Sequence, residues 1–444
     1  MTPSNFPPGP RARFPGALLL QTQGDLLGFF RRNVETFGDI FGFSPFGRRV
    51  VYLQHPDMIR DVLVTNQRLF AKGRALERAR PLLGNGLLTS EGDFHLRQRR
   101  LAQPAFHRDR ITQYATAMVS LTERMSATWH DGMSMDVHEQ MMSLTLHIVA
   151  STLFGTTVDD EAKELHDALD GALESFNMRM LPGSELMERL PLLWVRRFNR
   201  SRARLDATVY RIIRERRASS EDRGDLLSML LSATDAEGDG TGMSDEQLRD
   251  EVMTLFLAGH ETTANALTWV WYLLCRNPKA EERLHAEVDA LGHTPTIADL
   301  PRLEYARRVV MEAMRLYPPA YAIGRRVLED YEVGGYTIPA DSMVVVSQFL
   351  VHRDPRWFPK PDVFDPDRWL PEIAATRPKF SYFPFGAGTR ICIGEQFAWT
   401  EAILVVATLA QRWRFWLAPK QRISVQPRIT LRPKYGIKMV VRDR

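Results

Sequence analysis

The sequence predicts a mainly α-helical protein with a smaller β-rich part. Most of the 444 residues have helical periodicity, and only two runs, Arg49 to Gln54 and Met343 to Val351, have the β-branched character of strands. Hydrophobic residues make up 44% of the chain and charged residues 25%, which is typical of soluble globular proteins. The sequence shows no internal repeat.

The composition limits the classes of function. The formal net charge of +4 is small for this length and does not predict nucleic-acid binding. The two cysteines, Cys275 and Cys392, exclude a disulfide framework and favour a reducing compartment. The apolar run from Ala17 to Leu20 is shorter than a signal-peptide core or the about 20 apolar residues that span a bilayer. We therefore expect a cytoplasmic protein without a membrane anchor.

One predicted helix is much longer than the others. After the loop Ala233 to Gly242, the residues Ser244 to Gln247 form a capping box, and apolar residues then recur at helical spacing. Pro278 marks the end, so the helix spans Asp245 to Arg276, about 48 Å at 1.5 Å per residue. Its middle, Ala258 to Thr263, places a glycine, an acid and two threonines inside an apolar helix.

A glycine-rich loop precedes a second apolar helix. The loop, Phe383 to Gly394, contains Cys392, and the predicted helix spans Phe397 to Leu409. The positive end of a helix dipole favours the thiolate, the form of cysteine that ligates a metal. Backbone N–H groups of the turn can donate to the sulfur, and Gly394 allows close approach of a flat ring.

Other roles for the cysteines follow from the same residues. A lone intracellular cysteine is most often a small buried hydrophobe, and we assign Cys275, at an apolar helix end, to that class. A zinc site at Cys392 lacks partners at ligand spacing, since the nearest upstream histidine is His352. A cysteine nucleophile also needs a nearby histidine as base, which the loop does not offer.

The cysteine loop carries a family resemblance. The residues Phe385 to Gly394 match Phe-x-x-Gly-x-Arg-x-Cys-x-Gly at every fixed position, a coincidence on the order of 1 in 10,000 for average residue usage. The chain thus resembles the cytochrome P450 superfamily, and its soluble bacterial members in particular. The resemblance implies a P450 fold with a long central helix over a buried haem b (iron protoporphyrin IX). It also implies a single haem domain over residues 1–444, with no fused reductase.

The resemblance assigns the haem contacts. Cys392 is the expected iron ligand, and the expected haem neighbours are Phe385, Gly386, Gly394 and Ala258. The haem propionates need cations, and the matching positions are Arg390, Arg325, Arg99 and His95. His95 stands where the family often has Trp. A basic surface remains the alternative for these side chains.

Two further motifs occur in the family's order. Glu312 and Arg315, three residues apart in an apolar helix, resemble the family's structural Glu-x-x-Arg pair, with Arg368 as third member. The segment Ala258 to Thr263 resembles the oxygen-activation motif. There Thr262 would hydrogen-bond reduced dioxygen, Glu261 would relay protons from solvent, and Gly259 would leave room for oxygen.

The implied activity is a monooxygenase that inserts one oxygen atom of O2 into a small hydrophobic substrate by hydroxylation or epoxidation. Fatty acids, terpenoids and polyketides remain open as substrates. The expected pocket segments are apolar and comprise Gly73 to Thr89, Leu169 to Met180 (with Phe176 and Met178), Leu255 to Thr262, Ala320 to Gly324 (with Tyr321) and Arg428 to Tyr435. Methionines and aromatics at such spacing are more often plain core.

Electrons are expected from a ferredoxin or flavodoxin with its reductase. A basic face for an acidic partner is predicted from Arg97, Arg100, Arg307, Arg308, Lys360 and Lys379. Scattered solubilising charge is the alternative. Peroxide-using or isomerising haem-thiolate enzymes, which typically lack the acid–alcohol pair, and non-catalytic haem carriers, which need no proton relay, are disfavoured by Glu261 and Thr262.

Overall fold

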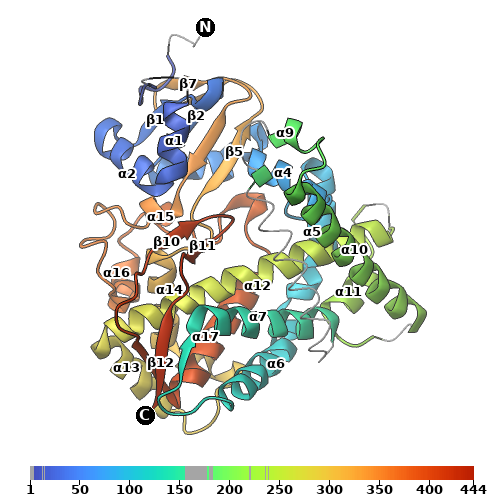
Figure 1. Ribbon diagram of the computed structural model, residues 1–444, viewed down its shortest axis with the longest axis vertical. Coiled ribbons are helices and arrows are strands. Elements are labelled where there is room, and N and C mark those ends of the chain that lie inside the picture. The colour runs from blue at the N-terminus through green and yellow to red at the C-terminus, as the bar shows by residue number, and fades with distance from the viewer. Residues whose placement is uncertain are drawn as a thin grey trace. The chain divides into compact units, whose positions relative to one another are not determined.

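The structure, a computed structural model, describes residues 5–12, 14, 16–155, 178–179, 184–219, 222–235, 237–238 and 240–444 (Figure 1). The chain divides into two compact units. Unit 1 comprises Met1–Arg74, Arg308–Cys392 and Ser424–Lys434, and unit 2 comprises Ala75–Arg307, Ile393–Ile423 and Tyr435–Arg444.

Unit 1 contains the larger part of the β structure. Its five-stranded sheet has the order β1-β2-β8-β5-β3, in which β2 and β8 are parallel and the other pairs antiparallel. The helices are α1 (Ala17–Gly24), α2 (Leu26–Phe37), α3 (Pro56–Arg60), α15 (Gln348–Val351) and α16 (Pro371–Ala374). The strands are β1 (Ile40–Phe43), β2 (Val50–Leu53), β3 (Phe70–Lys72), β5 (Ile323–Val327), β6 (Tyr331–Val333), β7 (Tyr336–Ile338), β8 (Met343–Val346), β10 (Val425–Pro427) and β11 (Leu431–Pro433). The helix α14 (Glu304–Leu316) belongs mainly to this unit.

The two predicted strands have different outcomes. The run Arg49 to Gln54 forms β2, one residue shorter at each end. The run Met343 to Val351 was predicted as one strand, and this is wrong beyond Val346, because Gln348–Val351 forms α15. Phe349 and Leu350 of α15 pack with α2 in an apolar core, so burial overrides their β propensity.

Unit 2 is predominantly helical. Its helices are α4 (Arg74–Leu83), α5 (Gly92–Ala102), α6 (Arg108–Ser126), α7 (Val137–Phe154), α9 (Ser184–Met187), α10 (Leu193–Ser219), α11 (Leu226–Ser232), α12 (Asp245–Arg276), α13 (Pro278–Asp289) and α17 (Glu395–Ala410). A three-stranded sheet of order β4-β12-β9 is formed by β4 (Ser134–Asp136), β12 (Lys438–Asp443) and β9 (Trp413–Leu417). The many helices and few strands confirm the predicted fold class.

The long helix α12 organises unit 2. It spans the predicted Asp245–Arg276, and its capping box is formed, with the Ser244 hydroxyl accepting from the Gln247 N–H and the Gln247 side chain accepting from the Ser244 N–H. The helices α7, α10 and α17 and the strand β9 all pack against α12 (Figure 1). The second predicted helix is α17, which begins at Glu395, two residues earlier than expected.

Candidate functional site

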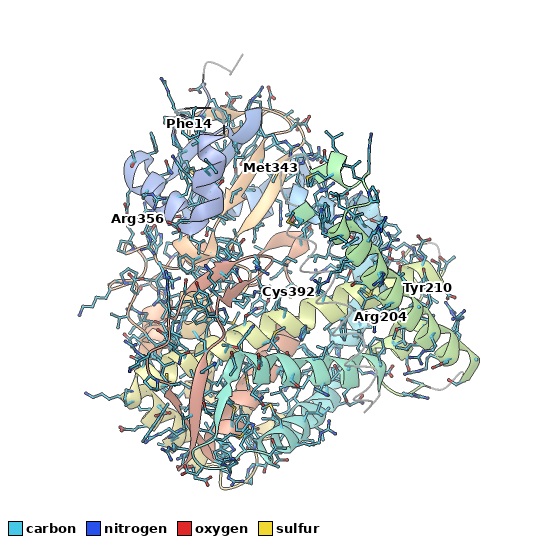
Figure 2. All side chains as sticks on the ribbon, viewed as in Figure 1. Phe14, Arg204, Tyr210, Met343, Arg356 and Cys392 are labelled. Atoms are coloured by element: carbon cyan, nitrogen blue, oxygen red, sulfur yellow. The ribbon has the colours of Figure 1, made fainter. Side chains whose placement is uncertain are left out.

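The cysteine loop of unit 1 presents an exposed thiol (Figure 2). Its turns require glycine at two positions, since Gly386 and Gly388 have φ angles of 74° and 71°. A Cβ at Gly388 would also overlap the carbonyl oxygen of Leu63, at 2.1 Å. The Cys392 N–H donates to the carbonyl of Phe385 at 3.0 Å, which closes the loop.

A buried ion pair lies at the centre of unit 1. The Glu312 carboxylate and the Arg315 guanidinium are fully buried and form a two-bond pair, with N–O distances of 2.8 and 2.9 Å. Glu312 also accepts from Trp369 Nε1 at 3.0 Å, and Arg368 Nε lies 3.3 Å from it. Burial of the pair, predicted from its apolar surroundings, is confirmed, and so is the proximity of Arg368.

This ion pair is linked to the cysteine loop by His352. Arg315 donates from Nη1 to the His352 carbonyl at 2.9 Å, and the imidazole Nε2 accepts from the Phe383 N–H at 3.0 Å. Burial holds the pKa of His352 well below its usual value, with Arg315 adding to the effect. The ring therefore stays neutral and keeps its acceptor nitrogen.

Two predicted propionate ligands belong to unit 1. Arg325 lies on β5 and Arg390 in the short 3-10 turn Gly388–Arg390, and both side chains are partly exposed. Arg325 donates from Nη1 to the carbonyl of Gly324 at 3.0 Å. Two of the predicted pocket segments also meet in this unit, since the Tyr321 hydroxyl donates to the Arg428 carbonyl at 2.8 Å.

In unit 2, one turn in the middle of the mostly buried helix α12 is partly exposed. Ala258 is exposed and Thr262 partly exposed, whereas Leu257, Glu261 and Thr263 are buried. The Thr262 hydroxyl donates to the Ala258 carbonyl at 2.7 Å. This turn of the helix therefore offers small side chains and a hydroxyl to a ligand.

Gly259 has a packing role that the sequence did not indicate. A Cβ added there would lie 3.0 Å from Cγ2 of Val149 on α7. The glycine therefore allows α7 to pack closely against α12, independently of any room it leaves for oxygen. The Thr145 hydroxyl of α7 donates to the His260 carbonyl at 3.0 Å and fixes the same contact.

The remaining predicted propionate ligands, His95 and Arg99, lie on α5. His95 is buried, and its Nδ1 lies 3.1 Å from the Leu87 carbonyl. A proton on Nδ1 satisfies this contact and fixes the orientation of the ring. Arg99 is partly exposed.

A buried carboxylate that sequence reasoning missed supports this region. Glu251 of α12 is fully buried, and it accepts from the Leu87 N–H at 3.1 Å and from Gln98 Nε2 at 2.9 Å. Its neighbour Asp250 accepts from the Asn85 N–H at 2.6 Å. The sequence contains little signal of this, because both acids follow the polar first turn of α12, where charged residues are usually exposed. Their burial requires the partners that the fold supplies.

A second buried acid lies behind the oxygen-activation segment. Glu401 of α17 is fully buried, and burial raises its pKa to about 8, although the neighbouring side chain of Thr263 opposes this shift. Glu401 is thus protonated at neutral pH. It was missed because α17 is apolar in sequence and only packing shows which of its faces lies against α12.

The predicted basic face is partly neutralised. In unit 2, Arg100 forms a two-bond ion pair with Asp235, at 2.8 and 2.9 Å, and Arg97 lies 3.7 Å from the same carboxylate. In unit 1, Arg308 pairs with Asp367 at 2.9 Å. The other three predicted residues are Arg307, Lys360 and Lys379, all exposed.

Two other sequence predictions concern a pocket segment and the second cysteine. The pocket segment Leu169 to Met180, with Phe176, lies outside the described residues except for Met178 and Arg179, and Met178 is exposed. Cys275 is half buried, and burial raises the pKa of its thiol to about 12. The thiol therefore stays protonated at neutral pH, and the side chain is less buried than predicted.

Comparison with known proteins identifies the family. The model of the cytochrome P450 family matches residues 7–440. The chain belongs to the cytochrome P450 family. Cyclooctatin synthase of Streptomyces melanosporofaciens is 45% identical, covering 90% of this chain and 88% of that protein. From the same organism, cyclooctat-9-en-7-ol 5-monooxygenase is 40% identical, covering 88% of this chain and 85% of that protein. Pentalenene oxygenase of Streptomyces avermitilis is 38% identical, covering 85% of this chain and 83% of that protein.

Solved structures agree with this P450 assignment. The haem domain of cytochrome P450DA is 29% identical with a TM-score of 0.89, covering 99% of this chain and 98% of that one. The retinoic acid-bound cyanobacterial CYP120A1 has the same TM-score at 26% identity and covers 99% of each chain. The P450 fold is therefore confirmed.

As a P450, the protein is a haem-thiolate monooxygenase with haem b as cofactor, and it uses a hydrophobic substrate and a redox partner. Bound haem supplies dioxygen activation and transfer of one oxygen atom. The described residues fit this cofactor, because unit 1 exposes a thiol in a glycine-rich loop and unit 2 exposes small residues in mid-helix. No helix within the described part of the chain combines the length and apolarity needed to cross a membrane.

Proposed function

We propose that this P450 oxidises a cyclic terpenoid, with Cys392 as the iron ligand. The names of two relatives refer to cyclooctat-9-en-7-ol and to pentalenene, which are terpenoids, and these relatives are 40% and 38% identical to this chain. This likeness carries the substrate proposal. The match to the family from residue 7 to 440 supports the further proposal that residues 1–444 act as one haem domain.

The proton path is proposed to run through Glu261 and Thr262. The Thr262 hydroxyl lies in the partly exposed turn, where it can turn from the Ala258 carbonyl toward a ligand. The buried Glu261 beside it can pass protons to the hydroxyl. Phe385, Gly386 and Gly394 are proposed to contact the haem, and Arg325, Arg390, Arg99 and His95 to bind its propionates.

Substrate binding tests the first proposal. Cyclic terpenoid hydrocarbons and alcohols, fatty acids and polyketide lactones are titrated against the holoenzyme, and the shift of the Soret band is followed. A shift with the terpenoids, and a product that carries one atom of labelled O2, is the expected result. A response to fatty acids or polyketides alone would overturn the terpenoid proposal while leaving the monooxygenase assignment intact.

Two substitutions test the site. Cys392→Ser should abolish the red-shifted Soret band that carbon monoxide gives with reduced haem-thiolate proteins. Thr262→Ala should retain the haem but lower coupled product formation on the order of 100-fold, with electrons diverted to hydrogen peroxide. Thr262→Ser, which keeps the hydroxyl, is the matched control. Full coupling in Thr262→Ala would exclude the proposed proton path.

We also propose a ferredoxin or flavodoxin as the redox partner. Lys360 and Lys379 of unit 1 are exposed, and their positive charge is suited to binding an acidic surface of the partner protein. Turnover with such a partner should fall with rising salt, and Lys360→Glu with Lys379→Glu should slow it further. Lys420→Glu, at an exposed site of unit 2, is the control. A rate indifferent to salt and to both lysines would refute this docking proposal.

A further inference from the structure

The helix α10 carries a charge that contrasts with the rest of the chain. It contains nine arginines against two acidic residues, a charge of +7, so all other residues together carry −3 of the total +4. One face of α10 is buried in the core of unit 2 through Phe198, Leu205 and Val209. Most of its arginines lie on the remaining surface, where Arg204 is labelled in Figure 2.

Three of these arginines form a stripe in which no acidic partner occurs among the described residues. Arg196, Arg200 and Arg204 follow at four-residue steps, so they share one face of the helix, and all three are exposed. Among the described residues, none forms an ion pair with them. The acids of α10 are engaged elsewhere, since Asp206 binds Arg249 at 2.7 Å and Glu215 lies 3.3 Å from Arg211.

In the segment just before α10, residues 184–192, the acidic side chains also pair with arginines outside the stripe. Its acids turn away from the stripe, because Glu188 pairs with Arg179 at 2.9 Å and Glu185 lies 3.8 Å from Arg78. No carboxylate of the described part of this segment therefore neutralises the arginines that follow it.

Exposed leucines lead into the arginine stripe. Leu186, Leu190 and Leu193 are 69%, 54% and 86% exposed, and Leu193 lies one helical turn before Arg196. Large apolar side chains exposed to this extent, followed by exposed guanidinium groups along the chain, are typical of a basic amphipathic surface. We call Leu186, Leu190, Leu193, Arg196, Arg200 and Arg204 the α10 surface.

We propose that the α10 surface docks the protein peripherally on an anionic lipid bilayer. The guanidinium groups bind lipid phosphates, and the leucines enter the apolar layer beneath the headgroups. A nucleic acid would match the arginines but would give the leucines no apolar environment, whereas an anionic bilayer supplies both a charged and an apolar layer. Since the substrate of a P450 is hydrophobic and partitions into bilayers, docking brings the enzyme to its substrate.

Vesicle sedimentation of the holoenzyme tests this proposal. The wild type should bind vesicles of mixed phosphatidylglycerol and phosphatidylcholine, should bind pure phosphatidylcholine far more weakly, and should be released by salt. The triple variant Arg196→Glu, Arg200→Glu, Arg204→Glu should bind the anionic vesicles at least ~10-fold more weakly. The triple variant Arg108→Glu, Lys279→Glu, Lys420→Glu makes the same change of charge at other exposed sites of unit 2 and should bind like the wild type.

A second variant separates the bilayer from other anionic partners. Leu190→Ser with Leu193→Ser leaves the charge unchanged and should weaken vesicle binding several-fold. Unchanged haem spectra and melting temperatures confirm that each variant is folded. Equal vesicle binding by wild type and arginine variant, or no binding to anionic vesicles at all, would overturn the proposal. So would unaffected binding by the leucine variant, which would point to an acidic protein or nucleic acid.

Discussion

The imidazole of His352 accepts a hydrogen bond from the backbone N–H of Phe383, with 3.0 Å between Nε2 and the backbone nitrogen. Arg315 holds the same histidine through its carbonyl oxygen, at 2.9 Å. Within unit 1, a continuous set of hydrogen bonds therefore joins the buried Glu312–Arg315 pair to the first residue of the cysteine loop. The pair stabilises the loop without contacting its cysteine.

Replacing His352 should show this connection. His352→Leu leaves the Phe383 N–H without its acceptor, so the free energy of unfolding should fall by ~1–3 kcal/mol. Urea unfolding measures the loss, and faster haem release would show that the loop has loosened. His107→Leu, at an exposed histidine, should have little effect on either quantity.

The pH dependence of the same variant supplies a second test. Because the pKa of His352 is depressed in the folded chain, the unfolded chain takes up the proton first. The wild type should therefore lose stability as pH falls below about 6.5, the ordinary histidine value. His352→Leu should lose less over that range, and identical slopes in both proteins would contradict the burial effect.

Breaking the buried ion pair should be severe. Glu312→Gln leaves the fully buried Arg315 and the nearby Arg368 without their carboxylate, so unfolding should require ~3–5 kcal/mol less free energy. Chemical denaturation of the holoenzyme provides the measurement. Glu304→Gln is the matched control, an exposed residue of the same helix, and should change stability by less than ~0.5 kcal/mol.

Removal of Glu251 should disturb α5. Glu251→Leu leaves the Leu87 N–H and the Gln98 amide without an acceptor, and the Leu87 carbonyl no longer holds the His95 ring in place. We expect a loss of ~2–4 kcal/mol in stability and faster transfer of haem to apomyoglobin. Glu251→Gln should rescue both, because its carbonyl still accepts and Gln98 can rotate. Normal haem transfer in Glu251→Leu would exclude the link to His95.

Glu401 should give stability an unusual dependence on pH. With its pKa raised to about 8, the folded chain keeps a proton that the unfolded chain loses near pH 4.5. As the pH rises from about 4.5 to about 8, this group should lower the free energy of unfolding by about 1.4 kcal/mol per pH unit. Above pH 8 the effect should level off. Glu401→Gln should abolish this slope, whereas the exposed control Glu282→Gln should keep it.

The sequence by itself determined the features that depend on local chemistry. The capping box and Pro278 set the bounds of α12, and the spacing of fixed residues from Phe385 to Gly394 predicted the family that the comparisons confirm. The apolar surroundings of Glu312 and Arg315 predicted their burial. Each of these inferences needed only residues close together in the chain, because caps, turns and helical pairs are local interactions.

Only the tertiary structure decided the contacts between distant segments. The run after Val346 forms α15 and packs on α2. A side chain at Gly259 would press on Val149 of α7, and Glu251 finds its partners more than 150 residues earlier in the chain. Glu401 became a protonated acid because α17 buries it against α12. Burial and partner choice depend on packing, and packing is a property of the folded chain as a whole.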